Sequence, residues 1–372
     1  MPVEFIGMLN SNGASESRQP RGPIIDKAYL AAIAHAHEHA GFDRVLIGYF
    51  SVGPDGFQVA NFAAAHTKNL KLLLAHRPGF VAPALAARQL ATLDHISDGR
   101  LAVHIITGSD DAEQKKEGDF VGKEERYART DEYLDVVRKV WTEPRPFDHE
   151  GPHYRVKAAF TPIKPVQTPH LPIYFGGSSS AAIQVAAKHA DVYALWGESL
   201  AQVRETVDAV RAAAVPHGRE HQIRFSLSLR PIVAATEAEA WAKAERILES
   251  ARALQSSSAL YGKPSADPPN VGSQRLLAAA AQGKVVDKRL WTEIAALTGA
   301  KGNSTALVGT PKQVAESLLD YYEAGITTFL IRGFDPLEDA LQYGRDLIPL
   351  VRSEIAQRDQ PSRAFGAAAG QN

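Results

Sequence analysis

The residues best suited to chemistry lie in one stretch near the middle of the chain, Leu171–Ser180, which reads LPIYFGGSSS. Ile173–Phe175 is apolar and favours a strand, Gly176 and Gly177 interrupt it, and three serines lead into a helical pattern from Ala181. The first turn of a helix presents backbone N–H groups without intrahelical partners, and glycine lets the backbone approach an anion closely. The stretch therefore predicts a phosphate-binding turn, although an ordinary strand–turn–helix with a serine N-cap has the same pattern.

Composition restricts the classes of protein to consider. The chain has 372 residues, of which 45% are hydrophobic and 22% charged, as in a soluble globular protein with room for one large barrel or two domains. A formal net charge of −1 gives no reason to expect a nucleic-acid or membrane partner. The absence of cysteine excludes disulfides, thiolate metal ligands and thiol nucleophiles. No apolar run is as long as a membrane span and the first residues do not resemble a signal peptide, so we expect a cytoplasmic protein.

Strand-like and helical patterns alternate along the chain in eight units. The predicted strands are Val3–Met8, Arg44–Ile47, Leu72–Ala75, Leu101–Ile106, Ile173–Phe175, Val192–Leu195, Arg224–Val233 and Thr327–Ile331. Eight units without a G-x-G-x-x-G motif favour a (β/α)8 TIM barrel over a doubly wound sheet. We expect a single domain over residues 1–356 with insertions at about 108–124, 143–170 and 255–305, the second containing a β-hairpin, and a disordered tail over 357–372.

The active site of such a barrel lies at the C-terminal ends of its strands, and this rule selects the candidate side chains. Beside the serine turn, the predicted rim contains His76, Arg77, Thr107, Trp196, Arg230 and Arg332. Hydroxyl, arginine and aromatic groups outnumber acids there. This composition suits an anion held below a planar ring better than hydrolysis by paired carboxylates.

Three of the candidates also have a structural interpretation. Arg77 either contacts an anionic substrate or pairs with an acid at the barrel mouth. Trp196 either lines a pocket or packs in the core, and Lys301 is either a lid residue between Gly299 and Gly302 or a solvated charge. The residues alone do not decide between these interpretations.

Histidines and acids elsewhere give weaker signals. His35, His37 and His39 imitate a metal cluster, but no third ligand of known position supports a site, so we predict no metal. His104 lies within the fourth strand and is expected to be a hydrogen-bonded core histidine. The pair Asp110-Asp111 either binds a cation or orders a loop and caps a helix.

Eight short motifs follow one another in a recognisable order. They are His76–Pro78, Ala87–Asp94, Asp98–Arg100, Thr107–Asp110, Glu125–Tyr127, Tyr174–Ser179, Trp196–Glu198 and Thr305–Gly309. In this order they resemble the bacterial luciferase-like flavin-dependent monooxygenases, and most closely the two-component alkanesulfonate monooxygenases. The resemblance runs from about Phe5 to Leu350, nearly the whole chain.

The resemblance implies a (β/α)8 barrel that assembles as a homodimer or homotetramer. It implies an enzyme that receives reduced FMN (FMNH2) from a separate NAD(P)H-dependent flavin reductase and uses O2 as co-substrate to form a C4a-peroxyflavin. In the alkanesulfonate branch this oxidant attacks sulfur, and the products are an aldehyde and sulfite. The protein must hold the flavin ring, exclude water and place the substrate beside the ring.

The same resemblance assigns the cofactor-binding residues. It places Thr107 against the flavin ring and Tyr127 toward the phosphate side. It assigns the FMN phosphate to the side chains of Ser178 and Ser179 and the backbone of Gly177. Gly177, Ser178 and Ser179 belong to the turn that the glycine and serine pattern already predicts to bind phosphate.

On the substrate side, Trp196 is expected to line the pocket, and Lys301 lies near the position of a lid arginine in the family. Other substrate residues depart from the alkanesulfonate pattern. The seventh strand carries Ser228 and Arg230 where that branch has an arginine and a histidine. Arg230 and Arg332 are therefore expected to anchor the anionic group of an alkanesulfonate or of another organosulfur or carboxylated compound.

Three other functions remain open at this point. The first is a deazaflavin-dependent dehydrogenase of the same fold. The second is a non-catalytic flavin-binding protein whose rebuilt substrate residues close the pocket. The third, which ignores the resemblance, is a barrel aldolase or isomerase that holds a sugar phosphate at Gly176–Ser180. No predicted strand carries a clear Schiff-base lysine, which counts against the aldolase.

Overall fold

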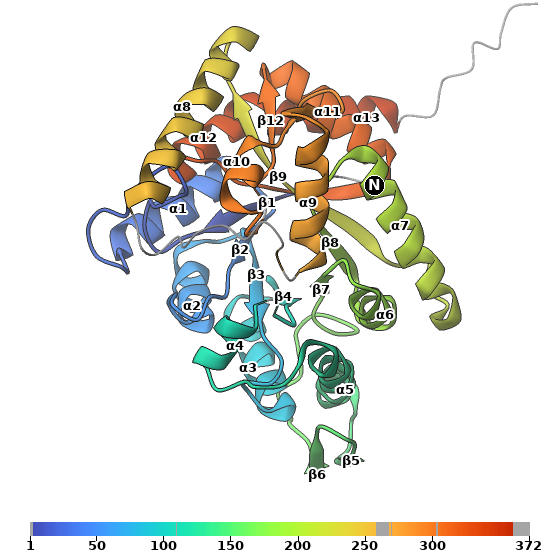
Figure 1. The fold of residues 1–372 in the computed structure, drawn as a ribbon. Coiled ribbons are helices and arrows are strands. Elements are labelled where there is room, and N and C mark those ends of the chain that lie inside the picture. The colour runs from blue at the N-terminus through green and yellow to red at the C-terminus, as the bar shows by residue number, and fades with distance from the viewer. Residues whose placement is uncertain (1–2, 109, 258–267, 269, 303, 360–372) are drawn as a thin grey trace, which may run out of the picture.

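A closed barrel of parallel strands forms the centre of the molecule (Figure 1). The computed structural model describes residues 3–108, 110–257, 268, 270–302 and 304–359. The barrel strands are β1 (Glu4–Leu9), β2 (Arg44–Ile47), β3 (Lys71–His76), β4 (Leu101–Ile105), β7 (Ile173–Gly176), β8 (Val192–Trp196), β9 (Arg224–Val233) and β13 (Ile326–Ile331). β1 pairs with β2 and β13, and β8 pairs with β9 to close the ring. This arrangement confirms the predicted (β/α)8 barrel.

The strands are buried on both faces, as expected of a parallel barrel covered by helices. Side chains from five strands meet in a small cluster that also contacts Leu46 and Leu330; its members are Ile6, Leu73, Ala102, Tyr174 and Val192. Alternate residues of the same strands, such as Phe5, Leu72 and Phe175, belong to the main core shared with the outer helices. The period-2 alternation of a strand thus separates an interior layer from an outer layer.

A ring of helices surrounds the barrel (Figure 1). These helices are α1 (Lys27–His39), α2 (Gly56–His66), α3 (Pro83–Ile96), α5 (Lys123–Thr142), α6 (Ser180–His189), α7 (Leu200–Ala214), α8 (Glu237–Ser257), α11 (Pro311–Glu323), α12 (Pro336–Asp346) and α13 (Ile348–Arg358). A short 3-10 helix, η1 (Val215–His217), follows α7. None of the described helices is both long and apolar enough to span a membrane.

Side-chain caps fix where several helices begin. Asp26 accepts a hydrogen bond from Tyr29 N, and Asp55 accepts one from Gln58 N. Ser199 and Thr310 each form a capping box with a glutamine three residues later. Because a cap satisfies a backbone donor that the first helical turn leaves unpaired, these residues mark where the loops that follow the strands end.

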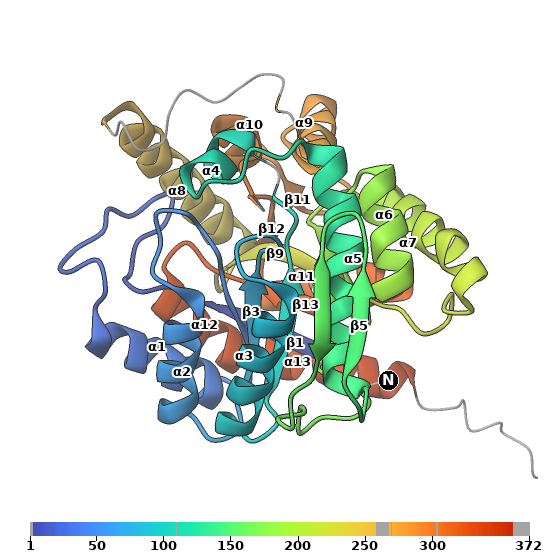
Figure 2. The same ribbon diagram turned by 90° about the horizontal axis from the view of Figure 1, so that it is seen from below.

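Additional elements cover the mouth and one side of the barrel. They are α4 (Asp111–Lys116), β5 (Phe147–Glu150), β6 (Arg155–Ala159), α9 (Val271–Gln282), β10 (Val285–Val286), β11 (Leu290–Trp291), α10 (Glu293–Thr298) and β12 (Ala306–Gly309). Figure 2 shows α4, α9 and α10 at one end of the molecule. α4 follows β4 directly, so this is the end at which the strands terminate.

The predicted hairpin at 147–160 is present as the antiparallel pair β5–β6. Glu132 of α5 holds it, because its carboxylate accepts hydrogen bonds from His149 Nε2 and from the backbone of His153 and Tyr154. β12 was not predicted as a strand. It pairs in parallel with Arg230–Val233, the part of β9 that extends beyond the barrel, and β11 and β10 continue this extension.

The ends of the predicted insertions differ in detail from the structure. A short helix, α4, lies in the predicted insertion 108–124. In the segment 255–305, residues 258–267, 269 and 303 lie outside the described residues. α13 continues to Arg358, two residues into the predicted tail, and residues 360–372 lie outside the described residues.

Candidate active site

The serine turn at the end of β7 has the geometry of an anion cradle. Gly177 has φ +141°, and a Cβ there would lie 2.8 Å from Ala182 Cβ and 3.2 Å from the Tyr127 hydroxyl. Only glycine fits this close approach of β7, α6 and α5. Ser179 is the N-cap of α6 and accepts a hydrogen bond from Ala182 N at 3.3 Å. The turn thus joins the first residues of α6 to the side chain of Tyr127.

Tyr193 of β8 orients the backbone of this turn. Its hydroxyl donates a hydrogen bond to the Gly177 carbonyl. A trans peptide points its N–H opposite to its C=O, so the Ser178 N–H is directed away from Tyr193. The N-terminus of α6 adds the partial positive charge of the helix dipole. Ser178 and Ser179 are both partly exposed.

Tyr127 lies beside the serine turn. It is 8% exposed on α5, and burial raises its pKa against the opposing effect of a hydrogen bond with Ser179. A neutral phenol is a hydrogen-bond donor, which is the form that a phosphate needs. The structure therefore brings together four of the five residues predicted to bind the cofactor: Tyr127, Gly177, Ser178 and Ser179.

The fifth, Thr107, follows β4 and is 5% exposed. Its hydroxyl has no hydrogen-bond partner among the described residues, and the same is true of both amide atoms of the fully buried Gln114. A Cβ on Gly108 would lie 2.3 Å from Gln114 Nε2, so the amide of Gln114 lies directly over the residue after Thr107. Buried polar groups normally have partners, so the Thr107 hydroxyl and the Gln114 amide are two adjacent buried groups with free hydrogen-bonding capacity among the described residues.

His104, in β4, is a correction to the sequence analysis. It was expected to be a hydrogen-bonded core histidine, yet its buried Nδ1 has no partner within the described part of the chain. Burial lowers its pKa to about 4, so it is neutral near pH 7. A Cβ on Gly176 would lie 3.7 Å from His104 Cε1, which places this ring beside the end of β7.

Arg77 takes part in an ion-pair network that holds α4 over the barrel mouth. Its side chain is 4% exposed and contacts Glu113 at 3.1 Å and Glu117 at 3.5 Å. The guanidinium also lies 4.4 Å from the centre of the Tyr49 ring, and Glu113 accepts a hydrogen bond from Ser51 N. These contacts favour the structural interpretation of Arg77. Arg77 and Tyr49 also line a cavity of about 720 Å³ between α2 and α3.

The acids after β4 also serve the structure. Asp110 is the N-cap of α4 and accepts hydrogen bonds from Ala112 N and Glu113 N. Asp111 pairs at 2.7 Å with Arg126, which is 1% exposed and also donates to the carbonyl of Val121. The arrangement matches the capping interpretation of the pair Asp110-Asp111.

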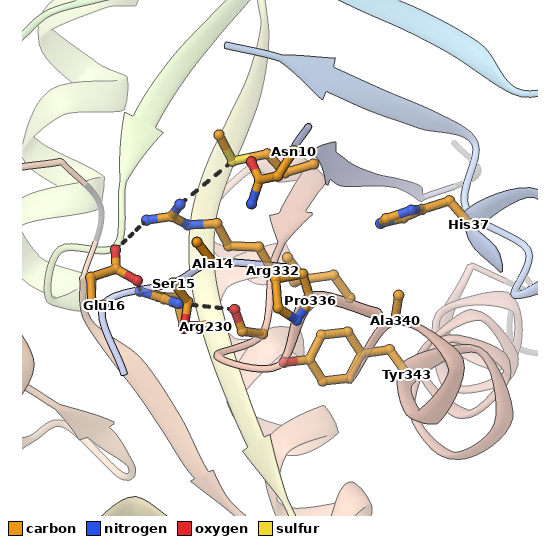
Figure 3. A pocket seen from close by; sticks show the side chains of 13 residues that line it. Asn10, Ala14, Ser15, Glu16, His37, Arg230, Arg332, Pro336, Ala340 and Tyr343 are labelled. Atoms are coloured by element: carbon orange, nitrogen blue, oxygen red, sulfur yellow. Dashed lines mark hydrogen bonds and ion pairs between the residues drawn. The ribbon is translucent and has the colours of Figure 1, made fainter. Parts of the chain in front are cut away.

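Arg230 and Arg332 meet at the opposite side of the mouth, and a carboxylate lies between them (Figure 3). Glu16, from the loop after β1, is 2.7 Å from Arg230 Nη1 and 3.0 Å from Arg332 Nη2. Arg230 also donates to the Gly333 carbonyl at 2.9 Å, and its guanidinium lies 3.5 Å from the centre of the Phe334 ring. The two predicted anion anchors are therefore adjacent, and both contact an acid that the sequence analysis did not select.

Burial and charge determine the protonation of this cluster. Burial raises the pKa of Glu16, but the charges of Arg230 and Arg332 outweigh it and lower the pKa from 4.5 to about 2. Burial lowers the pKa of Arg230 to about 10 despite the opposing charge of Glu16. Glu16 and Arg230 are therefore both charged at neutral pH. A cavity of about 20 Å³ borders the cluster, which is room for about one water molecule.

Trp196 and Lys301 lie near the insertion that contains α9. The Trp196 ring is partly buried, and a Cβ on Gly272 of α9 would lie 3.0 Å from it. Lys301 is exposed, in the turn between Gly299 (φ +64°) and Gly302 (φ +82°). Ser273 of α9 donates to the Ala300 carbonyl at 2.7 Å, so α9 holds this turn.

The first-helix histidines do not converge on one point. His37 is buried against Gly7 and Phe42, whereas His35 and His39 are exposed. Within the described residues, the carboxylates of Asp131 and Asp135 and the ring of His189 do have metal-ligand spacing. Lys188 Nζ contacts both carboxylates, at 2.9 and 2.8 Å, so the cluster already has a cation.

Solved structures with the same fold include several flavin enzymes. A riboflavin lyase, solved with modified FMN and riboflavin, has a TM-score of 0.78 and 22% identity over 95% of this chain and 92% of its own. An EDTA monooxygenase from Chelativorans sp. BNC1 has a TM-score of 0.76 and 21% identity over 95% of this chain and 94% of its own. A coenzyme F420-dependent tetrahydromethanopterin reductase from Methanopyrus kandleri has a TM-score of 0.69 and 18% identity over 94% of this chain and 100% of its own. These similarities establish the fold alone.

The sequence gives the more specific comparison. The model of the luciferase-like monooxygenase family matches residues 4–328, which includes seven of the eight barrel strands and the first half of β13. The match also includes the serine turn, Thr107 and Arg230. The chain belongs to the luciferase-like monooxygenase family.

Proposed function

We propose that this protein is a two-component monooxygenase that uses reduced FMN and O2 to oxygenate a small anionic organosulfur compound. The single observation that carries the cofactor assignment is the cradle at Gly177–Ser179, where β7, α6 and Tyr127 approach too closely for any side chain at residue 177. Such a turn at a helix N-terminus is suited to a terminal phosphate. FMN has that phosphate and a planar ring with hydrogen-bonding edges.

The other buried polar groups fit the same cofactor. Thr107 and Gln114 offer a hydroxyl and an amide without partners among the described residues, beyond the end of β4. The isoalloxazine ring has both donors and acceptors on its pyrimidine edge, which an amide can match. In this proposal Ser178, Ser179 and Tyr127 hold the phosphate, and Thr107 and Gln114 contact the ring.

When bound, reduced FMN supplies the electrons that activate O2 for oxygen transfer. The protein positions the two reactants and excludes water from the site. Arg230 and Arg332 anchor the anionic group of the substrate, Trp196 lines the apolar side of the pocket, and the turn around Lys301 closes over it. An alkanesulfonate is the substrate we favour, with an aldehyde and sulfite as products.

The proposal includes a partner. A two-component enzyme receives its reduced flavin from a separate NAD(P)H-dependent reductase, so this chain needs to bind free FMNH2 and not a nicotinamide. We also propose that the protein works as a homodimer or homotetramer in the cytoplasm. Gel filtration of the purified protein measures the assembly.

The test combines binding with turnover. Reduced FMN is titrated anaerobically into the protein, and binding is monitored by quenching of the fluorescence of the four tryptophans. We expect stoichiometric binding. With a flavin reductase, NADH and O2, a panel of alkanesulfonates is then assayed for sulfite. FMN binding without sulfite from any sulfonate would move the substrate to another class, and no binding of FMN in either redox state would contradict the proposal.

A second candidate is a deazaflavin-dependent dehydrogenase, because coenzyme F420 enzymes share this fold. Titration with both cofactors separates the two functions. A protein that binds F420 more tightly than FMN, and whose activity does not consume O2, is the dehydrogenase.

A further inference from the structure

The loop between β1 and α1 carries an acid into the barrel mouth although the loop itself lies at the surface. Every residue from Asn10 to Ile25 is at least partly exposed. Within this loop the Glu16 side chain is only 22% exposed, and its carboxylate contacts the side chains of Arg230 and Arg332. A solvent-exposed loop therefore supplies the counter-ion of a fully buried arginine.

The loop also makes polar contacts with the segment after β13. Ser15 Oγ donates to the Phe334 carbonyl at 2.6 Å, and Arg18 forms an ion pair with Asp335. The backbones of Ser15 and Arg18 pair with each other. Segments with little buried apolar contact open at low free-energy cost, so the main loss on opening this loop is the bridge made by Glu16.

That loss can be compensated only by another anion. Arg230 is 1% exposed, and a buried charge left without a partner is strongly destabilising. A carboxylate or sulfonate of a ligand has the same charge as Glu16 and similar oxygen atoms. Opening the loop while such a group binds therefore exchanges one anion for another.

We propose that Arg230 and Arg332 form an oxyanion-binding site which Glu16 of the same chain occupies, and that the anionic group of the substrate displaces Glu16. The inference rests on the proposed function for the identity of the ligand, a small sulfonate or carboxylate. It makes Glu16 a specificity-determining residue. A neutral compound cannot neutralise Arg230, so it cannot open the loop.

The first experiment measures the competition directly. Methanesulfonate and acetate are titrated calorimetrically, at low ionic strength, into the wild type and into Glu16→Gln. Because an attached carboxylate acts at an effective concentration of roughly millimolar or more, its removal is expected to tighten anion binding about tenfold or more. The stronger of the two anions identifies the sulfonate or carboxylate class. Equal or weaker binding of both anions to Glu16→Gln than to the wild type would overturn the inference.

Two further variants control this result. Glu205→Gln removes the same charge from an exposed ion pair with Arg275 and is expected to leave anion binding at the wild-type level. Glu16→Asp keeps the charge that Arg230 needs but shortens the side chain. Glu16→Asp replaces Glu16→Gln in the anion titration if Glu16→Gln does not fold. We expect its affinity for the anion to rise by a measurable factor that is smaller than tenfold. An unchanged affinity in this variant would count against the exchange.

The second experiment follows the loop. The chain has no cysteine, so a single Gln19→Cys substitution, at an exposed position of the loop, accepts a fluorescent label at one place. Methanesulfonate is expected to lower the anisotropy of the label in the protein with Glu16, because displacement frees the loop. Binding of methanesulfonate without any change at the label would show that Glu16 stays in place, and the inference would fail.

FMN titration of the same samples separates this inference from the proposed function. If the protein does not bind FMN but Glu16→Gln binds the anion more tightly than the wild type, the proposed function is contradicted and the exchange at Glu16 is supported. If FMN binds and the anion affinity of Glu16→Gln does not rise, the exchange alone falls.

Discussion

Replacing Glu16 by glutamine tests how much the bridge between the two arginines stabilises the protein. Folding lowers the pKa of Glu16 from 4.5 to about 2, and a carboxyl group with that change contributes roughly 3 kcal/mol at neutral pH. The variant keeps the shape of the side chain but leaves the charge of Arg230 buried without its counter-ion. We therefore expect the free energy of unfolding at neutral pH to fall by roughly 3 kcal/mol.

The loss is expected to depend on pH. The pKa of Glu16 is depressed on folding, so its stabilising effect is complete above pH 4.5 and is lost as the pH falls toward 2. A protonated Glu16 has the same charge as glutamine. The stabilities of the wild type and the variant should therefore converge in acid, although both proteins become less stable there.

Urea unfolding followed by circular dichroism, at neutral pH and at two pH values below 4.5, measures the difference. Glu205→Gln, which removes an acid from an exposed ion pair, is the control and should cost about 1 kcal/mol or less. A loss below about 1 kcal/mol for Glu16→Gln, or a loss that does not change with pH, would refute the assignment of Glu16 as the counter-ion of a buried arginine.

Three further predictions concern the cofactor side. The double variant Ser178→Ala/Ser179→Ala should weaken FMN binding by a few kcal/mol at most, since a charge-assisted hydrogen bond contributes about 1.5–3 kcal/mol. Fluorescence titration measures the affinity, with Ser180→Ala, at an exposed neighbouring position, as the control variant. A double variant that binds FMN as tightly as the wild type would place the phosphate elsewhere. Gly177→Ala should lose FMN binding and unfold at a lower temperature, because the added Cβ would lie 2.8 Å from Ala182 Cβ at a φ of +141°; an unchanged melting temperature in calorimetry would contradict this. Gln114→Leu should keep or raise the melting temperature, because it removes a buried amide without partners among the described residues. The affinity of the same variant for FMN should fall. A stable variant with unchanged affinity would show that the amide does not contact the flavin.

The fold was predictable because each of its elements has a local signal. Short β-prone runs such as Arg44–Ile47 alternate with amphipathic helices, and all eight barrel strands lie where their runs predict them. β12 was missed because Ala306–Gly309 is short and pairs with the part of β9 that leaves the barrel. Whether a four-residue run pairs at all depends on the neighbour that tertiary structure supplies.

The serine turn was also predictable as a local structure, and for a similar reason. Gly177, Ser178 and Ser179 are consecutive, and the break from strand to helix that makes the turn is a local property. Gln114 had no such signal, because a single polar residue in a one-turn helix looks like solvated surface. Only the packing of α4 against Gly108 reveals that its amide is buried without a partner among the described residues.

The substrate side shows what the sequence by itself could not determine. The sequence placed Arg230 and Arg332 at the ends of neighbouring strands, and a buried guanidinium such as that of Arg230 requires a counter-ion. Which acid supplies it depends on where the loop after β1 lies. Glu16 is distant from both arginines along the chain and belongs to no periodic pattern. Local chemistry thus determined the strands, the helices and the serine turn, whereas the long-range pairing of Glu16 with Arg230 and Arg332 arose only from the closed barrel.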